Sequence, residues 1–514
     1  MKDKIVFWFG GDFAQFCMAY YFQKKHDCEM YSIVDITNKP KIFFKNQKLI
    51  NFKKTWFLHD QYDKDHQKPD IDYLKYFEQK YKINLWQLAI NERHFYNFND
   101  YHKFSTNEIL SITEQICRFY ENLFDEVSPD FFITKLTAFY HLELFRKMCI
   151  YHGTKVLMLS NPKISNRNII SENDTKIDYI QNLDNVEFTP KTFDELRTDI
   201  EKMNSGLPMQ KQLMGYWEKH SSHSLISSLE PLLSFLFSPE TNSKTHYNYY
   251  GRTKFRVVIH SLKLILKRRI RENFLKQNFS FKPEINTPYI FLPLGIIQER
   301  HILIGAPFYT NQLEFVRMVA KSIPIGYRLL VKEHPGMWSR EWRSISEYKE
   351  LLKIPNVTMI HPSVSEIELI KNSSLVITTA GTSGFQATLY EKPSMIFSDI
   401  FYSYLPSVFR IKSIEELPLT VKKALSTKVD PNDLSKYMKI ISENIIDFNF
   451  ATFLSEFNSI FYHNGGFLDV IIDEKKMESF IRDREPELEY LSKCHIEKIQ
   501  QHKKFLQDET SNLN

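Results

Sequence analysis

Short apolar segments, each followed by a polar turn and then a helical pattern, recur in both halves of this 514-residue chain. At the start, Ile5–Phe9 runs into the turn Gly10-Gly11-Asp12, and an apolar helical pattern follows over Phe13–Tyr21. Strands that alternate with helices predict a mostly parallel sheet whose ligands bind at the carboxyl ends of the strands. This repeat therefore predicts an α/β protein.

The same strand signal returns in two groups. The first group continues with three segments: Met30–Val34, Phe131–Ile133 and Lys155–Leu159. The second group has five segments: Tyr289–Leu292, Arg328–Val331, Val357–Ile360, Leu375–Thr378 and Ser394–Phe397. Helical patterns over Tyr140–Tyr151 and Gln312–Lys321 separate some of them. We predict two Rossmann-like domains that face a central cleft.

A chain of this length exceeds one ordinary core. We divide it into an N-terminal acceptor domain over 1–200, an insertion over 201–285, a nucleotide-sugar domain over 286–430, and C-terminal helices over 431–514. The charged end, 501–514, is expected to be frayed.

The composition, 43% hydrophobic and 15% aromatic, is that of a globular chain. A net charge of +5 over the whole length gives no reason to expect a nucleic-acid partner. Five scattered cysteines without a CxxC pair fit a reducing cytoplasm. Because the start lacks a secretory signal pattern and no apolar run is long enough to span a bilayer, we expect a cytoplasmic protein, either soluble or peripheral at a membrane.

Basic and apolar residues are interleaved over 252–276 within the insertion. A basic amphipathic helix of this kind can lie on an anionic membrane surface. The pattern is equally typical of a linker helix that packs on its own protein and exposes a basic face. Both interpretations stay open at this point.

The first candidate binding motif, Lys332-Glu333-His334-Pro335, comes directly after a predicted strand. In sugar transfer from a nucleotide, the leaving phosphate gains negative charge in the transition state, and fixed cations or donors lower that barrier. We predict that this tetrapeptide binds the donor, with Lys332 and His334 holding phosphate oxygens. The alternative is a turn histidine fixed by the following proline.

The second motif lies fifty residues further on, where Leu375–Thr378 enters the turn Thr379-Ala380-Gly381-Thr382-Ser383-Gly384. Gly381 and Gly384 would let the backbone approach a ligand, and the hydroxyls of Thr382 and Ser383 with the free N–H groups of the next helix can cradle a phosphate. Two such turns in one domain predict one nucleotide-sugar site.

The sequence V-K-E-H-P followed by T-T-A-G-T-S-G-F-Q-A-T-L-Y-E-K-P-S-M-I-F resembles the capsular polysaccharide biosynthesis family, which includes the Kdo transferases. The resemblance is best over 289–410. It implies donor contacts by Lys332, His334, Thr382 and Ser383, and it suggests a CMP-linked acidic sugar as the donor.

Two further positions follow from the same resemblance. A segment that usually carries a glutamine and an acidic residue corresponds here to Gln298 and Glu299. Many relatives have glutamate at the position of Gln386, which keeps the hydrogen-bonding ability and loses the charge.

Inverting transfer requires a base within reach of the acceptor hydroxyl, normally from the N-terminal domain. The candidates are Asp12, His141 and Glu143. No DxD-type motif ends a strand of the second domain, so we predict transfer without a catalytic metal and without a cofactor other than the nucleotide-sugar substrate. The acceptor is expected to be a glycan or a lipid-linked glycan.

Three other functions remain compatible with these motifs. A polyol-phosphate transferase of the teichoic-acid type would have a similar histidine-proline strand end. A nucleotide-sugar epimerase would need no acceptor. A non-catalytic binding or scaffold protein would keep the fold and lose the activity, which the change at Gln386 would allow.

Overall fold

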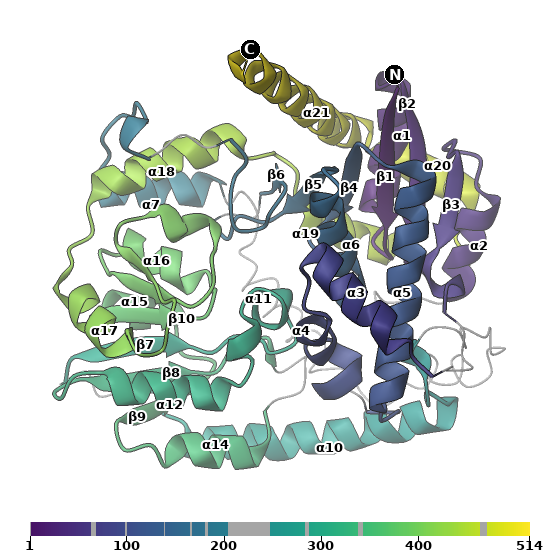
Figure 1. Cartoon of the computed structure of the whole chain (residues 1–514). Coiled ribbons are helices and arrows are strands. Elements are labelled where there is room, and N and C mark those ends of the chain that lie inside the picture. Colours follow the sequence, from purple (N-terminus) through teal and green to yellow (C-terminus); the bar gives the residue numbers. More distant parts are fainter. Residues whose placement is uncertain are drawn as a thin grey trace.

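The computed structural model describes residues 2–513 except 63–67, 98–99, 138, 165–166, 180–182, 204–246, 283–286, 338–342 and 463–469. It has two α/β domains, each built around a six-stranded sheet (Figure 1). The two-domain, Rossmann-like fold predicted from the strand pattern is confirmed.

The N-terminal sheet has the strand order β3-β2-β1-β4-β5-β6. All neighbours are parallel except β5 and β6. Its strands are β1 (Asp3–Phe9), β2 (Cys28–Val34), β3 (Lys54–Phe57), β4 (Phe131–Lys135), β5 (Lys155–Ser160) and β6 (Ile169–Ser171).

The C-terminal sheet is entirely parallel and has the order β12-β11-β10-β7-β8-β9. Its strands are β7 (Tyr289–Pro293), β8 (Arg328–Lys332), β9 (Val357–Ile360), β10 (Leu375–Thr378), β11 (Ser394–Ile396) and β12 (Val408–Arg410).

Helices cover both faces of each sheet, which is why β1 is apolar at every position from Ile5 to Phe9 and does not alternate. In the N-terminal domain, α3 to α6 lie on one face and α1 with α2 on the other. These helices are α1 (Ala14–Lys25), α2 (Asn38–Asn46), α3 (Ile71–Tyr81), α4 (Leu85–Ile90), α5 (Thr106–Val127) and α6 (Tyr140–Tyr151).

The C-terminal sheet is covered in the same way, by α12, α14 and α17 on one face and by α15, α16 and α18 on the other. The helices of this domain are α11 (Arg300–Leu303), α12 (Gln312–Ser322), α14 (Ile345–Leu352), α15 (Glu366–Lys371), α16 (Ser383–Leu389), α17 (Leu417–Ser426) and α18 (Pro431–Asn444).

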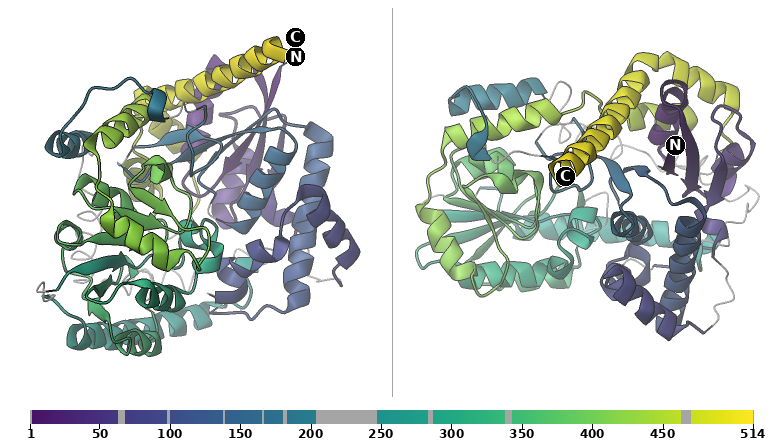
Figure 2. Two further views of the ribbon diagram at one scale, coloured as in Figure 1. Left: turned by 60° about the vertical axis from the view of Figure 1, so that its left-hand side comes forward. Right: turned by 45° about the horizontal axis from the view of Figure 1, so that its top comes forward.

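The chain crosses between the domains more often than the four predicted segments suggest. Helix α7 (Phe193–Met203) follows the N-terminal sheet but packs on α16 and α18. Helix α10 (Lys254–Asn278) runs along one side of both domains (Figures 1 and 2). Much of the predicted insertion, residues 204–246, lies outside the described residues.

The last three helices return to the N-terminal domain, where α21 crosses α1 (Figure 2). They are α19 (Phe450–Phe461), α20 (Glu474–Asp483) and α21 (Glu485–Leu513). The prediction of a frayed tail from residue 501 is wrong, because α21 continues to Leu513. The charges there are spaced for a solvated helix surface, and a helix already anchored by packing extends with little further ordering. In the part of the chain that the structure describes, no helix is long and apolar enough to cross a membrane.

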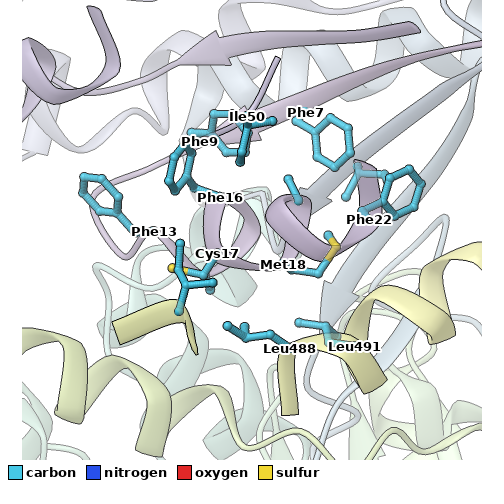
Figure 3. Close-up of a cluster of buried hydrophobic side chains, with 14 of the residues drawn as sticks. Phe7, Phe9, Phe13, Phe16, Cys17, Met18, Phe22, Ile50, Leu488 and Leu491 are labelled. Atoms are coloured by element: carbon cyan, nitrogen blue, oxygen red, sulfur yellow. The ribbon is translucent and has the colours of Figure 1, made fainter. Parts of the chain in front are cut away.

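The returning helices complete an aromatic core under β1 and α1 (Figure 3). Phe13 lies between Phe44 and Phe457, with ring centroids 5.0 Å from each. On the same side, Leu488 and Leu491 of α21 pack under Cys17 and Met18. Such stacked aromatic pairs stabilise by about 0.5–1.5 kcal/mol beyond the area that they bury.

We expect Phe457→Ala to destabilise the N-terminal domain by about 3–5 kcal/mol, because the buried ring leaves a cavity between α1 and α19. Thermal unfolding followed by circular dichroism measures the change. Phe308→Ala is the matched control, since Phe308 is 84% exposed and its loss should leave the midpoint within experimental error. Equal midpoints for the two variants would contradict the assignment of α19 to this core.

Candidate functional site

The order of the strands predicts where a ligand would bind in each sheet. In an open parallel sheet, ligands bind beside the carboxyl ends of two neighbouring strands whose connections leave in opposite directions. In the N-terminal sheet this point lies between β1 and β4, and in the C-terminal sheet it lies between β7 and β10. The turns singled out in the sequence follow β1 and β10, and the first binding motif follows β8, the other neighbour of β7.

The motif after β8 has one inward and one outward side chain. Glu333 is completely buried, and its carboxylate accepts bonds from Arg343 Nε and from the Tyr348 hydroxyl, both at 2.9 Å. Arg343 also donates to the carbonyl of Gly295 after β7. Glu333 therefore fixes the loops after β7 and β8 to each other. The sequence predicted that Glu333 contacts the donor, whereas its side chain lies inside the protein.

His334 is half-buried and its ring is oriented by its own turn. The Gly336 N–H donates to His334 Nδ1 at 2.9 Å, so in the neutral ring the proton is on Nε2. Burial lowers the pKa of His334 and outweighs the opposite effect of Glu299 and Glu366. The neutral imidazole therefore offers one N–H donor near neutral pH.

The turn glycine next to this histidine is required by packing. A Cβ on Gly336 would lie 2.7 Å from Ile296 and 3.0 Å from the His334 ring. Any larger residue would displace the ring or the loop after β7. The half-buried Pro335 fixes the backbone between the two.

Glu366, at the start of α15, brings the two predicted motifs together. The Ser383 hydroxyl donates a short hydrogen bond to Glu366 Oε1, and the Lys332 ammonium lies 3.9 Å from Glu366 Oε2. Lys332 is almost completely buried, and burial lowers its pKa while Glu366 raises it. The predicted meeting of the motifs after β8 and β10 is thus present, with Glu366 as an unpredicted link.

The two turn glycines have an internal reason for being small. A Cβ on Gly384 would lie 2.5 Å from the Tyr402 hydroxyl, and one on Gly381 would lie 2.7 Å from Thr378 Oγ1. The Tyr402 hydroxyl also donates to the Gly381 carbonyl. Close packing on Tyr402 therefore accounts for Gly384, and close packing on Thr378 accounts for Gly381.

The other residues of this turn differ in exposure. Thr382 is exposed at the start of α16, and Gln386 is half-buried one turn later. Helix α16 has only seven residues. Because the Ser383 hydroxyl already donates to Glu366, the Thr382 hydroxyl and the His334 ring are the side-chain hydrogen-bond donors that these motifs offer to an anion.

Gln298 and Glu299, after β7, lie where the two domains meet. The Gln298 carbonyl accepts a 2.6 Å hydrogen bond from Arg93 Nε of the N-terminal domain. Glu299 pairs with His301 at 3.1 Å. Burial by itself would raise the pKa of Glu299, but His301, with smaller effects of Lys163 and His334, lowers it to about 2. Glu299 is therefore an ionised group beside the histidine of the first motif.

In the N-terminal domain, Asp12 forms an ion pair with Lys135 at the end of β4. Its other carboxylate oxygen accepts the Ala14 N–H at 3.2 Å. Burial lowers the pKa of Lys135 to about 8, which still leaves the amine mostly charged at neutral pH. This pair lies between β1 and β4, where the topology predicts a ligand.

The backbone next to Asp12 is strained. Phe13 has φ 56°, a left-handed conformation that costs an aromatic residue of order 1–3 kcal/mol and persists only where packing enforces it. The Tyr462 hydroxyl, from the end of α19, donates to the Gly11 carbonyl at 2.6 Å. The returning C-terminal helices therefore hold the turn that carries Asp12.

His141 is a member of a buried cluster centred on Asp35. Its Nε2 lies 3.0 Å from one Asp35 oxygen, and its Nδ1 lies 3.4 Å from the Tyr247 hydroxyl. His59 Nε2 lies 2.9 Å from the other oxygen of Asp35. Burial lowers the pKa of His59, while the two imidazoles overcome the effect of burial and hold the pKa of Asp35 well below its usual range. Because both nitrogens of His141 are engaged, this ring has no position free for an acceptor proton.

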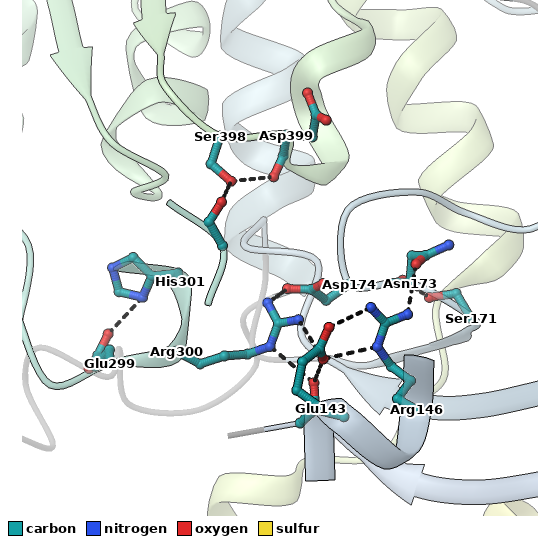
Figure 4. A network of polar contacts seen from close by, with 12 residues as sticks. Glu143, Arg146, Ser171, Asn173, Asp174, Glu299, Arg300, His301, Ser398 and Asp399 are labelled. Carbon is teal, nitrogen blue, oxygen red and sulfur yellow. Dashed lines mark hydrogen bonds and ion pairs between the residues drawn. The ribbon is translucent and has the colours of Figure 1, made fainter. Parts of the chain in front are cut away.

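Glu143 lies in the contact between the domains (Figure 4). Its carboxylate pairs with Arg146 at 2.7 Å, accepts the Thr137 hydroxyl at 2.6 Å, and lies 3.6 Å from Arg300 of the C-terminal domain. Arg300 also pairs with Asp174. Burial would raise the pKa of Glu143, but Arg146, Arg300 and Thr137 lower it to about 2. A carboxylate so acidic is a poor base, which disfavours Glu143 for that role.

We expect Glu143→Gln to lower the free energy of unfolding at pH 7 on the order of 3 kcal/mol, since it leaves two buried arginines short of a counter-charge. A carboxyl with a lowered pKa stabilises the fold above its unfolded pKa, near 4.5, and this stabilisation is lost as the pH falls towards 2. The difference between the variant and the wild type should therefore shrink as the pH falls below about 4.5 and become small near pH 2. Thermal unfolding over a pH series tests this; the exposed Glu314→Gln is the control, and a pH-independent difference would contradict the ion pair.

Two hollows in the described part of the chain lie away from these residues. One, of about 640 Å³, is lined by Arg197, Glu201 and Tyr390, among others. The second, of about 360 Å³, is at the amino-terminal edge of the N-terminal sheet, beside Asp3 and Phe131. Neither contains a predicted site residue. Within the described ranges, no group of three or more His, Cys, Asp or Glu side chains could hold a metal ion.

Four important residues lie outside the motifs of the sequence. Lys135 is the last residue of β4, and Glu366 is the first residue of the helix after β9, so their positions relative to strands were the available signal. Arg300 and His59 gave no signal in the sequence, because each acts through a partner more than 20 residues away.

The fold and the two facing sites define a two-domain protein of the GT-B-like type, in which residues after β7 contact residues after β4. Residues 238–405 match the family model described as capsule polysaccharide biosynthesis protein. The family resemblance predicted from the sequence is confirmed for this stretch, about a third of the chain.

Solved structures similar to this chain include KpsC, a β-Kdo 2,7-transferase from Thermosulfurimonas dismutans, at 13% identity and a TM-score of 0.30, covering 66% of this chain and 88% of that one. They also include the UDP-GlcNAc 2-epimerase of Methanocaldococcus jannaschii, at 14% identity and a TM-score of 0.23, covering 86% and 100%. At these low scores, the two-domain assignment rests on the sheet topology itself. No curated protein matches the sequence.

Proposed function

We propose that the protein is an inverting, metal-independent glycosyltransferase that moves a sugar from a nucleotide donor to a glycan or lipid-linked acceptor, with the donor in the C-terminal domain. The observation that carries this proposal is the convergence of His334, Lys332 and Ser383 beside the point where the C-terminal sheet changes direction. Asp12 stands at the corresponding point of the N-terminal sheet.

On the donor side, the Nε2–H of His334 and the hydroxyl of Thr382 would donate to phosphate oxygens, while the Ser383 hydroxyl, which donates to Glu366, would position the turn. When the bond between the sugar carbon and the phosphate oxygen breaks, the electron pair leaves with the nucleotide. The Nε2–H of His334 is already oriented by the hydrogen bond from Gly336, so it stabilises that charge without reorganising. Such preorganised hydrogen bonds are the main way in which these sites lower a barrier. The ammonium of the buried Lys332 lies 3.9 Å from Glu366 and partly offsets the negative charge of that carboxylate beside the phosphate.

On the acceptor side, Asp12 is the base that fits best. Of the three predicted candidates, His141 has both nitrogens engaged and Glu143 is held as an ion pair with two arginines. As the acceptor oxygen bonds to the sugar carbon, its proton passes to the Asp12 carboxylate. Lys135 would keep part of its ion pair with Asp12 during the reaction. It would thereby position the carboxylate and also bind an anionic group of the acceptor.

The nucleotide and the compartment are also part of the proposal. The family resemblance favours a cytidine nucleotide, and the five unpaired cysteines, four of them buried, agree with a reducing cytoplasm.

We expect one of CMP, CDP, UDP and GDP to raise the melting temperature of the wild type, and His334→Ala to lose that response, because a ligand that binds only the folded state stabilises it by mass action. At a nucleotide concentration about 100 times the Kd, the stabilisation is about 2.7 kcal/mol. His152→Ala, away from the site, is the control and should keep the response. A response that survives in His334→Ala would move the donor site elsewhere.

The products separate the remaining alternatives. A glycosyltransferase releases the nucleotide only as the sugar moves to an acceptor, whereas a polyol-phosphate transferase moves a phosphate with its polyol, and an epimerase changes the sugar without releasing the nucleotide. Nucleotide binding without any of these reactions would favour the scaffold.

We expect Asp12→Asn to reduce the rate of transfer by a factor of about 10²–10⁴ while the thermal response to the nucleotide persists, because the amide cannot take the acceptor proton. Asp27→Asn is the matched control, since Asp27 is also paired with a lysine but is exposed. The rate is measured as acceptor-dependent nucleotide release. Unchanged transfer by Asp12→Asn would exclude Asp12 as the base.

A further inference from the structure

Helix α10 has two apolar faces, and among the described residues one face packs on the protein while the other is mostly exposed. Val257, Leu264 and Leu275 lie on the inner face and are half-buried or buried. On the opposite side, Phe255 is 72% exposed, Leu262 55%, Leu266 61% and Ile270 60%. At 100° per residue these four side chains lie within roughly 80° of arc, so they form one continuous stripe. We call it the outer stripe.

The outer stripe is not needed to hold α10 in place. The helix is attached at its ends: Arg252, just before it, lies over Tyr101, and His260 pairs with Asp100 at 3.6 Å. At the other end, Leu275 and Phe279 enter the core of the C-terminal domain. Figure 1 shows the helix running along one side of both domains. Over 25 residues, its length is about 37 Å.

Positive charge is concentrated beside the stripe. The segment 252–276 has nine arginines and lysines and a single carboxylate, Glu272, although the whole chain has a net charge of only +5. The remainder of the chain is therefore slightly acidic. By the same helical geometry, Arg256, Lys263 and Lys267 flank the outer stripe on one side and Arg269 flanks it on the other.

We propose that α10 docks the protein on an anionic lipid surface, with the outer stripe inserted among the lipid headgroups and the flanking cations against the phosphates. An anionic lipid surface is the partner that contacts both the cations and the outer stripe. A polyanion such as nucleic acid would bind the cations but leave the four apolar side chains in water, and a neutral membrane would contact only the outer stripe. Because α10 is attached to both domains, docking would fix both at a defined distance from the membrane. This goes beyond the proposed transfer reaction and does not depend on it.

Sedimentation of the full-length protein with vesicles tests the proposal. We expect binding to phosphatidylcholine vesicles in which about a third of the lipid is phosphatidylglycerol, and at least about tenfold weaker binding to pure phosphatidylcholine. The double variant Leu266→Ser/Ile270→Ser should lose at least about tenfold in binding because it removes apolar area from the stripe. Lys263→Glu/Arg269→Glu should lose at least as much, since each cation near an anionic surface contributes about 1 kcal/mol.

Matched controls come from α17 and the residues directly after it. Leu419 is as exposed as Phe255, and Lys422 and Lys428 are exposed, so Leu419→Ser and Lys422→Glu/Lys428→Glu should bind as the wild type does. Three results would overturn the proposal. The first is no binding of the wild type to anionic vesicles, which would mean that another part of the chain covers the stripe. The second is unchanged binding of the serine variant with loss of binding by the charge variant, which would mean that the surface recognises polyanions. The third is binding of both variants as tight as that of the controls.

Discussion

One buried arginine joins the two domains through ion pairs on both sides of their contact. Arg300 leaves the C-terminal sheet just after β7 and pairs with Asp174 and Glu143 of the N-terminal domain. At 3.6 Å and an effective dielectric constant of 20, the attraction to Glu143 is roughly 4–5 kcal/mol, about as large as the desolvation that burial imposes. The pairs therefore add little net stability. Their effect is geometric, because an arginine fork satisfies two carboxylates in only a narrow range of positions.

This contact is connected to both candidate sites. The neighbours of Arg300 are Glu299 and His301, and Glu299 acts electrostatically on His334. On the other side, Thr137, which bonds to both Glu143 and Arg300, follows the strand that ends in Lys135, the partner of Asp12. A change in the domain contact would thus move the groups proposed for the donor and for the acceptor together.

A second constraint is the return of the C-terminal helices to the N-terminal domain. Phe457 and Tyr462 of this segment contact the strained turn around Phe13 and Gly11, which lies next to Asp12. The left-handed conformation of Phe13 is unfavourable by itself, and its cost is offset by aromatic packing from residues more than 400 positions away. The N-terminal site is therefore complete only when both ends of the chain are in place.

The sequence by itself determined the fold class, most strands, and the two motifs of the C-terminal domain. Each of these depends on local signals: apolar runs such as Arg328–Val331, turn residues, and the position of a motif after a strand. Tertiary structure decided which residues of the motifs face outward. Glu333 turns inward to Arg343, Gly381 and Gly384 are small because Thr378 and Tyr402 respectively lie against them, and Glu366 links Lys332 to Ser383. It also decided the charge partners of Asp12, His141 and Glu143, because these partners come from distant segments and no local pattern encodes them.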